Sequence, residues 1–397
     1  MSEVKAGDPG QYTVSSRMKT AYTVCMFLGL IGFALLMIND QKRAWLAFLL
    51  PFFYFTSLAL GGLFFTAIQH LTKAGWSVNV RRITESFTSF FPVTAVAALI
   101  FLFGSNKIYS WMDKAHVAAD AILQGKVGYL NMTFFVIRLV LFIGGWMWFS
   151  KKIVGRSIEQ DTTGEDELSN KQVKTSIGFI LFFALSYSFF AVDLLMSLEP
   201  HWFSTIYGVY SFAGLFQSTL AFTILLIIYM KKHGLLAGYV TDDHMHDLGK
   251  FLFAFTVFWA YIAFSQYMLI WYANLPEETG FIITRTEGVW LPVSIFLLLG
   301  KFIVPFIALL PRWAKRNPAH LAAVSCLILV MQYVDLYWLT YPIFYADELK
   351  APVGEIAVFL GFLGVFLFVV TKFLAKNKIV PIKDPRIGES LHHHVVY

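Results

Sequence analysis

The sequence is poor in the residues that build redox centres and soluble surfaces. Its 397 residues include two cysteines, Cys25 and Cys326, and no C-x-x-C motif. Iron–sulfur clusters are held by cysteine thiolates, so we expect no such cluster on this chain. Charged residues make up only 14% of the sequence, against about 25% in typical soluble domains. This low charge content argues against a soluble globular protein.

Long hydrophobic runs fill the chain instead, and the mean hydropathy is +0.63. Stretches of about 20 apolar residues recur from end to end, each long enough to span a bilayer as a helix and too long for a barrel strand. Backbone groups in lipid must be satisfied internally. We therefore predict an all-α polytopic membrane protein with about ten transmembrane helices. The spans are expected at 20–38, 45–70, 87–104, 131–150, 174–196, 204–230, 249–272, 289–310, 320–344 and 354–375.

The net charge of +6 does not indicate nucleic-acid binding, because the positive residues are distributed as in a membrane protein. With ten spans both termini lie on one side, where we count 22 of the 31 Lys and Arg residues, against seven on the other side. The positive-inside rule then places both termini in the cytoplasm. Residues 1–19 are polar and no small-residue cleavage site follows the first apolar run, so we expect no removable signal peptide. Membrane lipids are expected partners, and nucleic acid is not.

An internal repeat predicts two copies of one structural unit. AVDLLMSLEP (191–200) and YVDLYWLTYP (333–342) share Val-Asp-Leu and a proline seven residues after the aspartate. These segments fall four spans apart, which predicts two four-helix bundles. The expected organisation is an N-terminal cytoplasmic segment 1–19, a peripheral helix 20–38, a first bundle 45–196, a second bundle 204–344, a peripheral helix 354–375 and a cytoplasmic tail 376–397.

Four ionisable residues fall inside the predicted spans, where unpaired charge is costly. Asp193 and Asp335 belong to the repeated segments, whereas Arg138 and Lys301 lie in the fourth and eighth spans. The repeat predicts that Arg138 meets Asp193 and that Lys301 reaches toward Asp335. These contacts are either structural ion pairs, or sites where a carboxylate exchanges protons or contacts a polar ligand.

A polar segment follows Asp193 at the outer end of the fifth span. We expect Pro200 to stop this helix and Glu199 and His201 to lie at the outer surface. With Asp193 they would form a polar ladder into the bundle. Histidine titrates near neutral pH, so the ladder could conduct protons. A capped helix end with an interfacial histidine is the alternative.

Other polar residues are expected near the cytoplasmic surface. Arg82 and Glu85, three residues apart, can pair just before the third span. His70 ends the second span, and Asp247 belongs to a His/Asp cluster at 242–247. That cluster is either a metal site or a solvated loop, and we predict no metal. His70, Glu85 and Asp247 are the expected inner mouth of a proton path.

Two longer loops are also expected. Residues 105–130 mix aromatic and charged side chains, including His116, and predict an interfacial helix or a docking surface on the outer side. Residues 155–172 are charged and are expected to form a flexible cytoplasmic loop.

Four segments resemble a known family of membrane subunits. They are SLEPHWFSTIYGVYSFAG (197–214), AGWSVNVRRITESF (74–87), HDLGKFLFAFTVFWAYIAFSQYMLIWYANLPEET (246–279) and DPRIGESLHHHV (384–395). The chain resembles the NrfD-type, polysulfide-reductase-like family over nearly its whole length. The closest resemblance is to the second such subunit, the F subunit, of bacterial alternative complex III, a quinol:cytochrome c oxidoreductase.

The resemblance implies a ten-helix subunit of a respiratory complex in the bacterial inner membrane, without a redox centre of its own. The implied partners are a periplasmic iron–sulfur/molybdopterin-like subunit, c-type haem subunits and a paralogous ten-helix NrfD-like subunit. Haem c and iron–sulfur clusters would belong to these partners. In the family the paralogue is the better candidate for quinol oxidation, and the F-type subunit is expected to carry a proton path.

Three hypotheses follow. In the first, Asp193 and Asp335 are the central carboxylates of a proton path whose outer mouth is Glu199 and His201. In the second, this chain binds quinol itself, with His116, Glu199 and His201 at the outer edge of the site. In the third, the chain is a secondary transporter or a purely structural anchor.

Overall fold

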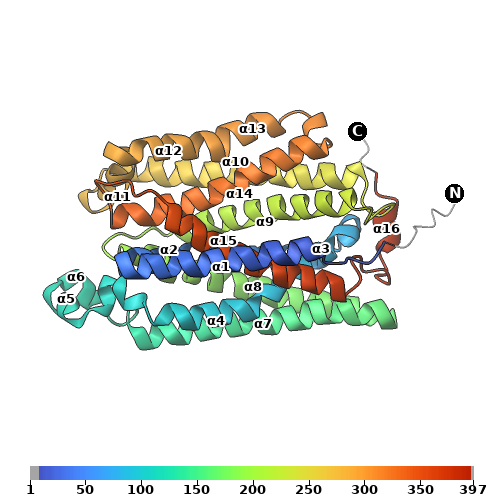
Figure 1. Ribbon diagram of the computed structural model, residues 1–397, viewed down its shortest axis with the longest axis horizontal. Coiled ribbons are helices and arrows are strands. Elements are labelled where there is room, and N and C mark those ends of the chain that lie inside the picture. Colours follow the sequence, from blue (N-terminus) through green and yellow to red (C-terminus); the bar gives the residue numbers. More distant parts are fainter. Residues whose placement is uncertain (1–8, 395–397) are drawn as a thin grey trace.

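Ten helices long and apolar enough to cross a membrane run along one axis of the structure (Figure 1). The computed structural model describes residues 9–394, so parts of the predicted segments 1–19 and 376–397 lie outside the described residues. The segment that leads into α1 (Ser16–Asn39) and the helix α16 (Ile387–Leu391) lie at the same end of the molecule (Figure 1). We call this end the terminal side and the opposite end the far side. The prediction of an all-α polytopic membrane protein is confirmed.

The helices form two bundles flanked by a helix pair. The first bundle contains α2 (Gln41–Leu71), α3 (Val78–Phe87), α4 (Phe91–Leu102), α7 (Met132–Thr163) and α8 (Asp166–Leu194). The second contains α9 (Tyr207–Lys232), α10 (Asp242–Ala273), α12 (Leu291–Leu297), the π-helical turn η7 (Leu298–Ile303), α13 (Val304–Leu309) and α14 (Pro318–Thr340). The flanking pair is α1 (Ser16–Asn39) and α15 (Val353–Lys376).

Short elements connect these helices. The α-helical ones are α5 (Lys114–Ala119), α6 (Ala121–Lys126), α11 (Pro276–Thr286) and α16 (Ile387–Leu391). The 3-10 turns are η1 (Gly75–Ser77), η2 (Thr88–Phe90), η3 (Ser105–Lys107), η4 (Ser110–Met112), η5 (Met196–Leu198), η6 (Gly288–Trp290), η8 (Trp313–Lys315) and η9 (Tyr341–Ile343). The predicted outer loop 105–130 thus contains two short helices, α5 and α6, which extend beyond the bundle on the far side (Figure 1).

Helix α2 forms the centre of the molecule. Its most apolar stretch is entirely buried, as expected for a helix that is hydrophobic all round. It packs against α8 of its own bundle and against α9 of the second bundle. Helices α4 and α7 lie on one flank of the molecule, and α10, α12 and α13 lie on the other (Figure 1). The two bundles therefore share one core around α2, α8 and α9.

Helices α1 and α15 pack against each other more extensively than any other pair. Their backbones approach closely at glycines: a Cβ atom added at Gly29 would lie 2.5 Å from the Cα atom of Gly361. Small residues allow this approach in membranes, where apolar burial does not drive helix association. The outer face of α1 is exposed and apolar, whereas α15 also packs against α2 and α3.

Three expectations about helix ends are wrong. The third helical segment begins at Gly75, so Arg82 and Glu85 lie inside it and are buried. The expected flexible loop 155–172 is helical except for a tight turn around Gly164, whose φ of +72° suits glycine. Helix α8 ends at Leu194, before Pro200, and the turn η5 follows it.

The glycine contact between α1 and α15 gives a stability prediction. We expect Gly361→Leu to lower the free energy of unfolding by about 1–3 kcal/mol, because the side chain would force the backbones apart. Gly144→Leu is the matched control, since open space surrounds Gly144 on its helix. Thermal unfolding in detergent checks both. Equal midpoints for the two variants would contradict the close contact.

Candidate functional site: buried ion pairs

The first predicted ion pair is present near the far side of the first bundle. Arg138 on α7 donates two hydrogen bonds to Asp193, at 2.6 and 3.0 Å. The Tyr129 hydroxyl donates to the same carboxylate at 2.9 Å. The guanidinium also lies over the Tyr129 ring, 3.9 Å from its centroid. A bidentate, stacked arginine of this kind holds its partner in one geometry.

The second predicted ion pair is present in the second bundle. The Lys301 ammonium lies 2.5 Å from Asp335 and donates to the Gln332 side chain at 2.6 Å. The Tyr210 hydroxyl donates to the other Asp335 oxygen at 2.5 Å. The lysine is completely buried, beneath the face of Trp259. We call Lys301, Asp335, Tyr210 and Gln332 the Asp335 cluster.

A break in helix geometry accompanies Lys301. Pro305 lacks a backbone N–H, so the Lys301 carbonyl four residues earlier loses its usual helical donor. The helix adopts the π-helical turn η7 at this point. Such turns are rare and frequently occur at functional sites.

The predicted contacts among Asp193, Glu199 and His201 in the outer polar ladder are wrong. His201 is half-exposed and pairs at 2.6 Å with Asp120, which begins α6. Glu199 faces Arg285 of α11, at 3.7 Å. Asp193 contacts neither, because α8 ends just after it and the chain turns away through η5. His116 is exposed on α5. Of the three residues expected at the outer edge of a quinol site, His201 contacts Asp120 and Glu199 contacts Arg285, so the structure shows no shared contact among His116, Glu199 and His201.

Burial and charge set the protonation of these far-side groups. Burial raises the pKa of Glu199, and the nearby Arg285 only partly offsets it. Burial lowers the pKa of Arg285 to about 10, which leaves the guanidinium charged at neutral pH. Burial and the Asp193 carboxylate raise the pKa of the Tyr129 phenol. Tyr129 therefore remains a hydrogen-bond donor.

The terminal side carries a second set of buried charges, here called the Glu85 cluster: Arg81, Arg82, Glu85 and Asp161. Arg82 lies 3.1 Å from Glu85, the predicted pair, and 2.9 Å from Asp161. Arg81 lies 3.4 Å from Glu85. Mutual neutralisation of this kind explains how four charges fit in a helical interior.

The two other expected inner-mouth residues lie apart from each other. Asp247, on α10, lies 2.6 Å from Lys250 and 2.7 Å from His393. His70 is buried at the end of α2, and its Nε2 atom has no hydrogen-bond partner. Among residues 9–394, no three His, Cys, Asp or Glu side chains are grouped to hold a metal ion.

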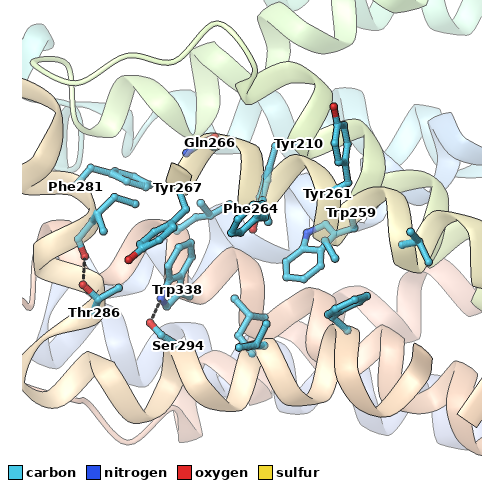
Figure 2. A pocket seen from close by; sticks show the side chains of 18 residues that line it. Tyr210, Trp259, Tyr261, Phe264, Gln266, Tyr267, Phe281, Thr286, Ser294 and Trp338 are labelled. Atoms are coloured by element: carbon cyan, nitrogen blue, oxygen red, sulfur yellow. Dashed lines mark hydrogen bonds between the residues drawn. The ribbon is translucent and has the colours of Figure 1, made fainter. Parts of the chain in front are cut away.

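A cavity of about 600 Å³ lies beside the Asp335 cluster in the second bundle. Aromatic side chains of α10 dominate one wall, and α12 with Ser294 faces them; Tyr267, Phe264 and Trp338 lie between these two helices in Figure 2. Tyr210 and Trp259 form its inner wall, whereas Tyr261 and Phe264 are largely exposed. The cavity therefore opens sideways onto the apolar surface of the protein.

Sequence reasoning missed several polar partners. The sequence pattern does not single out Arg285, although PEETGFIITRT (276–286) has the proline start and acidic first turn of a helix. Arg43 forms a bidentate ion pair with Glu355, at 2.6 and 2.9 Å, which ties α2 to α15. No sequence signal selects Tyr129 and Tyr210 from the 18 tyrosines of the chain.

No protein-family model matches this chain, and a search of curated proteins found no significant match. The residues and their geometry therefore carry the functional argument. The chain is a polytopic membrane protein with ten candidate spans.

Breaking the Lys301–Asp335 pair tests its energetic role. We expect Lys301→Met to lower the free energy of unfolding by about 3–5 kcal/mol, because it leaves a buried carboxylate without its cation. The double variant Lys301→Met/Asp335→Asn should recover part of this loss. At the exposed Glu167–Lys171 pair, Lys171→Met should cost less than about 1 kcal/mol. A double variant no more stable than Lys301→Met would contradict the pairing.

The raised pKa of Glu199 predicts a pH-dependent stability. Above the ordinary glutamate pKa of about 4.3, the folded state keeps a proton that the unfolded state has lost, so stability falls as pH rises toward the raised value. Glu199→Gln removes this fall. Relative to the wild type, the free energy of unfolding of the variant should increase by up to about 1 kcal/mol as pH rises from 4 to 7. Thermal unfolding measures this difference. Glu277→Gln is the control, because Glu277 is exposed. A stability difference between Glu199→Gln and the wild type that shrinks with rising pH would contradict the prediction.

Proposed function

We propose that this chain is a membrane subunit of a quinol-oxidising respiratory complex of the alternative complex III type, and that it conducts protons. The family resemblance of four segments and the two-bundle architecture support this proposal. The terminal side would face the cytoplasm of a bacterium, as the charge distribution indicates. The chain would hold no redox centre, and its iron–sulfur, haem c and paralogous partners would carry the electrons.

The Asp335 cluster is the observation that carries the proton role. A buried lysine can give its proton to a carboxylate, whereas an arginine remains charged. The Lys301–Asp335 pair, at 2.5 Å, can therefore exist in an ionised or a neutral form and can exchange a proton with a neighbour. Arg138 and Asp193 occupy the matching place in the first bundle, but their pair is fixed. The geometry thus favours Asp335 over Asp193 as the working carboxylate.

Two tyrosines connect the Asp335 cluster to the far surface. Tyr210 donates to Asp335, and the buried Tyr207 lies within electrostatic range of Asp335, Arg285 and Glu199. Glu199 is 30% exposed, and burial raises its pKa, so it holds a proton more readily than an ordinary glutamate. We assign Glu199 as the outer end of the path, with Asp120 and His201 at the adjacent surface.

Polar side chains also lead from the cluster toward the first bundle. Gln332, which accepts from Lys301, lines a small void between the bundles together with Ser57 and Ser218. The Ser57 hydroxyl lies 3.1 Å from that of Tyr187 on α8. The Asp335 cluster therefore borders the shared core through Gln332.

A second function, direct quinol binding, is favoured by the cavity beside the same cluster. Quinols are lipid-soluble rings that need apolar walls and groups that accept their protons. The cavity opens sideways, has aromatic walls, and includes Gln266, whose buried Oε1 atom has no hydrogen-bond partner. One ring hydroxyl could donate a hydrogen bond to this atom, and a proton of the other hydroxyl could pass through Tyr210 to the Asp335 carboxylate.

Exchange of the two cations tests the proton role in the purified complex. We expect Lys301→Arg to keep the ion pair but to reduce quinol oxidation and proton release about 100-fold, because arginine cannot release its proton. Arg138→Lys is the matched control and should retain most of the turnover. Asp335→Asn, which needs no extra volume, should reproduce the loss. Wild-type proton release in Lys301→Arg and Asp335→Asn would contradict the proposal.

The same preparation separates the remaining hypotheses. Co-purifying large subunits and reduced c-haem absorption support the respiratory complex, whereas a colourless, solitary 45.2 kDa protein would contradict it and favour a transporter. Ala263→Leu narrows the cavity. A raised KM for quinol with unchanged kcat in this variant would assign the cavity to quinol, and an unchanged KM would exclude that assignment.

A further inference from the structure

The chain after α15 turns back across the terminal side of both bundles. We call residues 377–394 the C-terminal strap. Its apolar residues Ile379 and Val380 are completely buried, and α16 packs against η1 and α3. The sequence predicted only a cytoplasmic tail here, whereas the structure shows an ordered covering.

Ionic contacts fix the strap to the first bundle. Asp384 pairs with Arg81, and both side chains are almost completely buried. The Lys383 ammonium donates to the Thr162 carbonyl at the end of α7. Gly75 allows close packing, because a Cβ atom there would lie 2.0 Å from the Glu389 carboxylate.

Polar contacts also fix the strap to the second bundle. The buried Ser390 hydroxyl donates to the Trp76 carbonyl at 2.7 Å and lies 3.2 Å from the His244 ring. His393 lies 2.7 Å from Asp247 at the start of α10. The strap thus joins the two bundles at the end where the Glu85 cluster lies.

A small polar cavity lies directly beneath the strap. Its volume of about 30 Å³ exceeds the roughly 10–15 Å³ that one water molecule requires. Asp384 and Arg386 of the strap cover it, and His70, Gln69 and Arg81 line it from below. His70 is only 5% exposed, and its Nε2 atom has no hydrogen-bond partner.

Two further polar groups without partners lie on α8. The amide oxygen and nitrogen of Gln172 and the hydroxyl of Ser176 make no hydrogen bond, although both residues are completely buried. They are four residues apart and share one helix face. Ser169 and Val173, which line the cavity, lie on neighbouring positions of that face. Buried polar atoms without protein partners are normally satisfied by internal water.

We propose that the strap is a lid over a water-filled inlet that runs from His70 along Gln172 and Ser176. Opening of the Asp384–Arg81 contact connects these waters to the aqueous phase on the terminal side. The inlet is inferred from the contacts of the strap and from the unpartnered polar atoms beneath it. Its use as a proton entry rests on the proposed function. The residues beyond Ser176 on this face, Phe179 and Phe183, are apolar and buried, so the inlet ends there.

Thiol labelling tests the lid. In a Cys25→Ala/Cys326→Ala background in nanodiscs, Ser176→Cys replaces one small side chain by another at the end of the inlet. We expect a small cationic methanethiosulfonate reagent to label it slowly, and Asp384→Asn to accelerate the labelling about tenfold or more, because the strap opens more often. His392→Ala is the matched control, since His392 is exposed on the strap and bonds only the nearby Gly388 carbonyl. Ser186→Cys, beyond the two phenylalanines, should stay unlabelled.

Equal labelling rates with and without Asp384→Asn would overturn the lid, as would labelling of Ser186→Cys at the Ser176→Cys rate. His393→Ala, which removes the contact to Asp247, gives an independent opening variant if Asp384→Asn does not fold. Turnover in the assembled complex then separates the two proposals. Accelerated labelling with unchanged proton release would keep the lid and exclude the inlet from the proton path, whereas a parallel change in both supports the proton entry.

Discussion

Charge neutralisation inside an apolar bundle is the constraint on which the rest of this structure depends. Isolated charges are costly in a membrane interior, and breaking a buried ion pair costs several kcal/mol. The carboxylates of Asp193, Asp335, Asp161 and Glu355 each lie against a cation supplied by another helical segment. These pairs fix which helix faces meet, because any other rotation of a helix would strand a charge.

The two halves of the repeat solve this constraint with different cations, and the difference has chemical consequences. Arginine offers a planar fork that locks Asp193, while lysine offers a single ammonium that can lose its proton. The accompanying tyrosines also differ in origin, since Tyr129 precedes α7 and Tyr210 lies in α9. The first bundle thus holds a rigid pair, and the second holds a pair beside a cavity and a π-helical turn.

Hydropathy was sufficient to predict the ten spans, and the repeat was sufficient to predict the contacts of Arg138 with Asp193 and of Lys301 with Asp335. These signals failed where charged residues are buried together and neutralise one another. A hydropathy average treats Arg81, Arg82 and Glu85 as part of a loop, although all three lie inside a helix. The Glu199–Arg285 contact joins residues far apart in sequence and depends on how α11 folds back. The strap was missed because nothing in a polar tail shows which surface it will cover. The functional roles of these residues stay predictions.

The pairing of α1 with α15 has a consequence for how the protein is made. Helix α1 is synthesised before the eight intervening spans and α15 after them, yet each finds its most extensive contact in the other. Helix α1 must therefore remain without its main partner while the intervening spans are inserted. The glycine contact closes only after α15 arrives, so a chain truncated before Gly354 would leave α1 without that partner and open to quality-control proteases. Formation of the α1–α15 contact thus reports that every span between the two helices has been made.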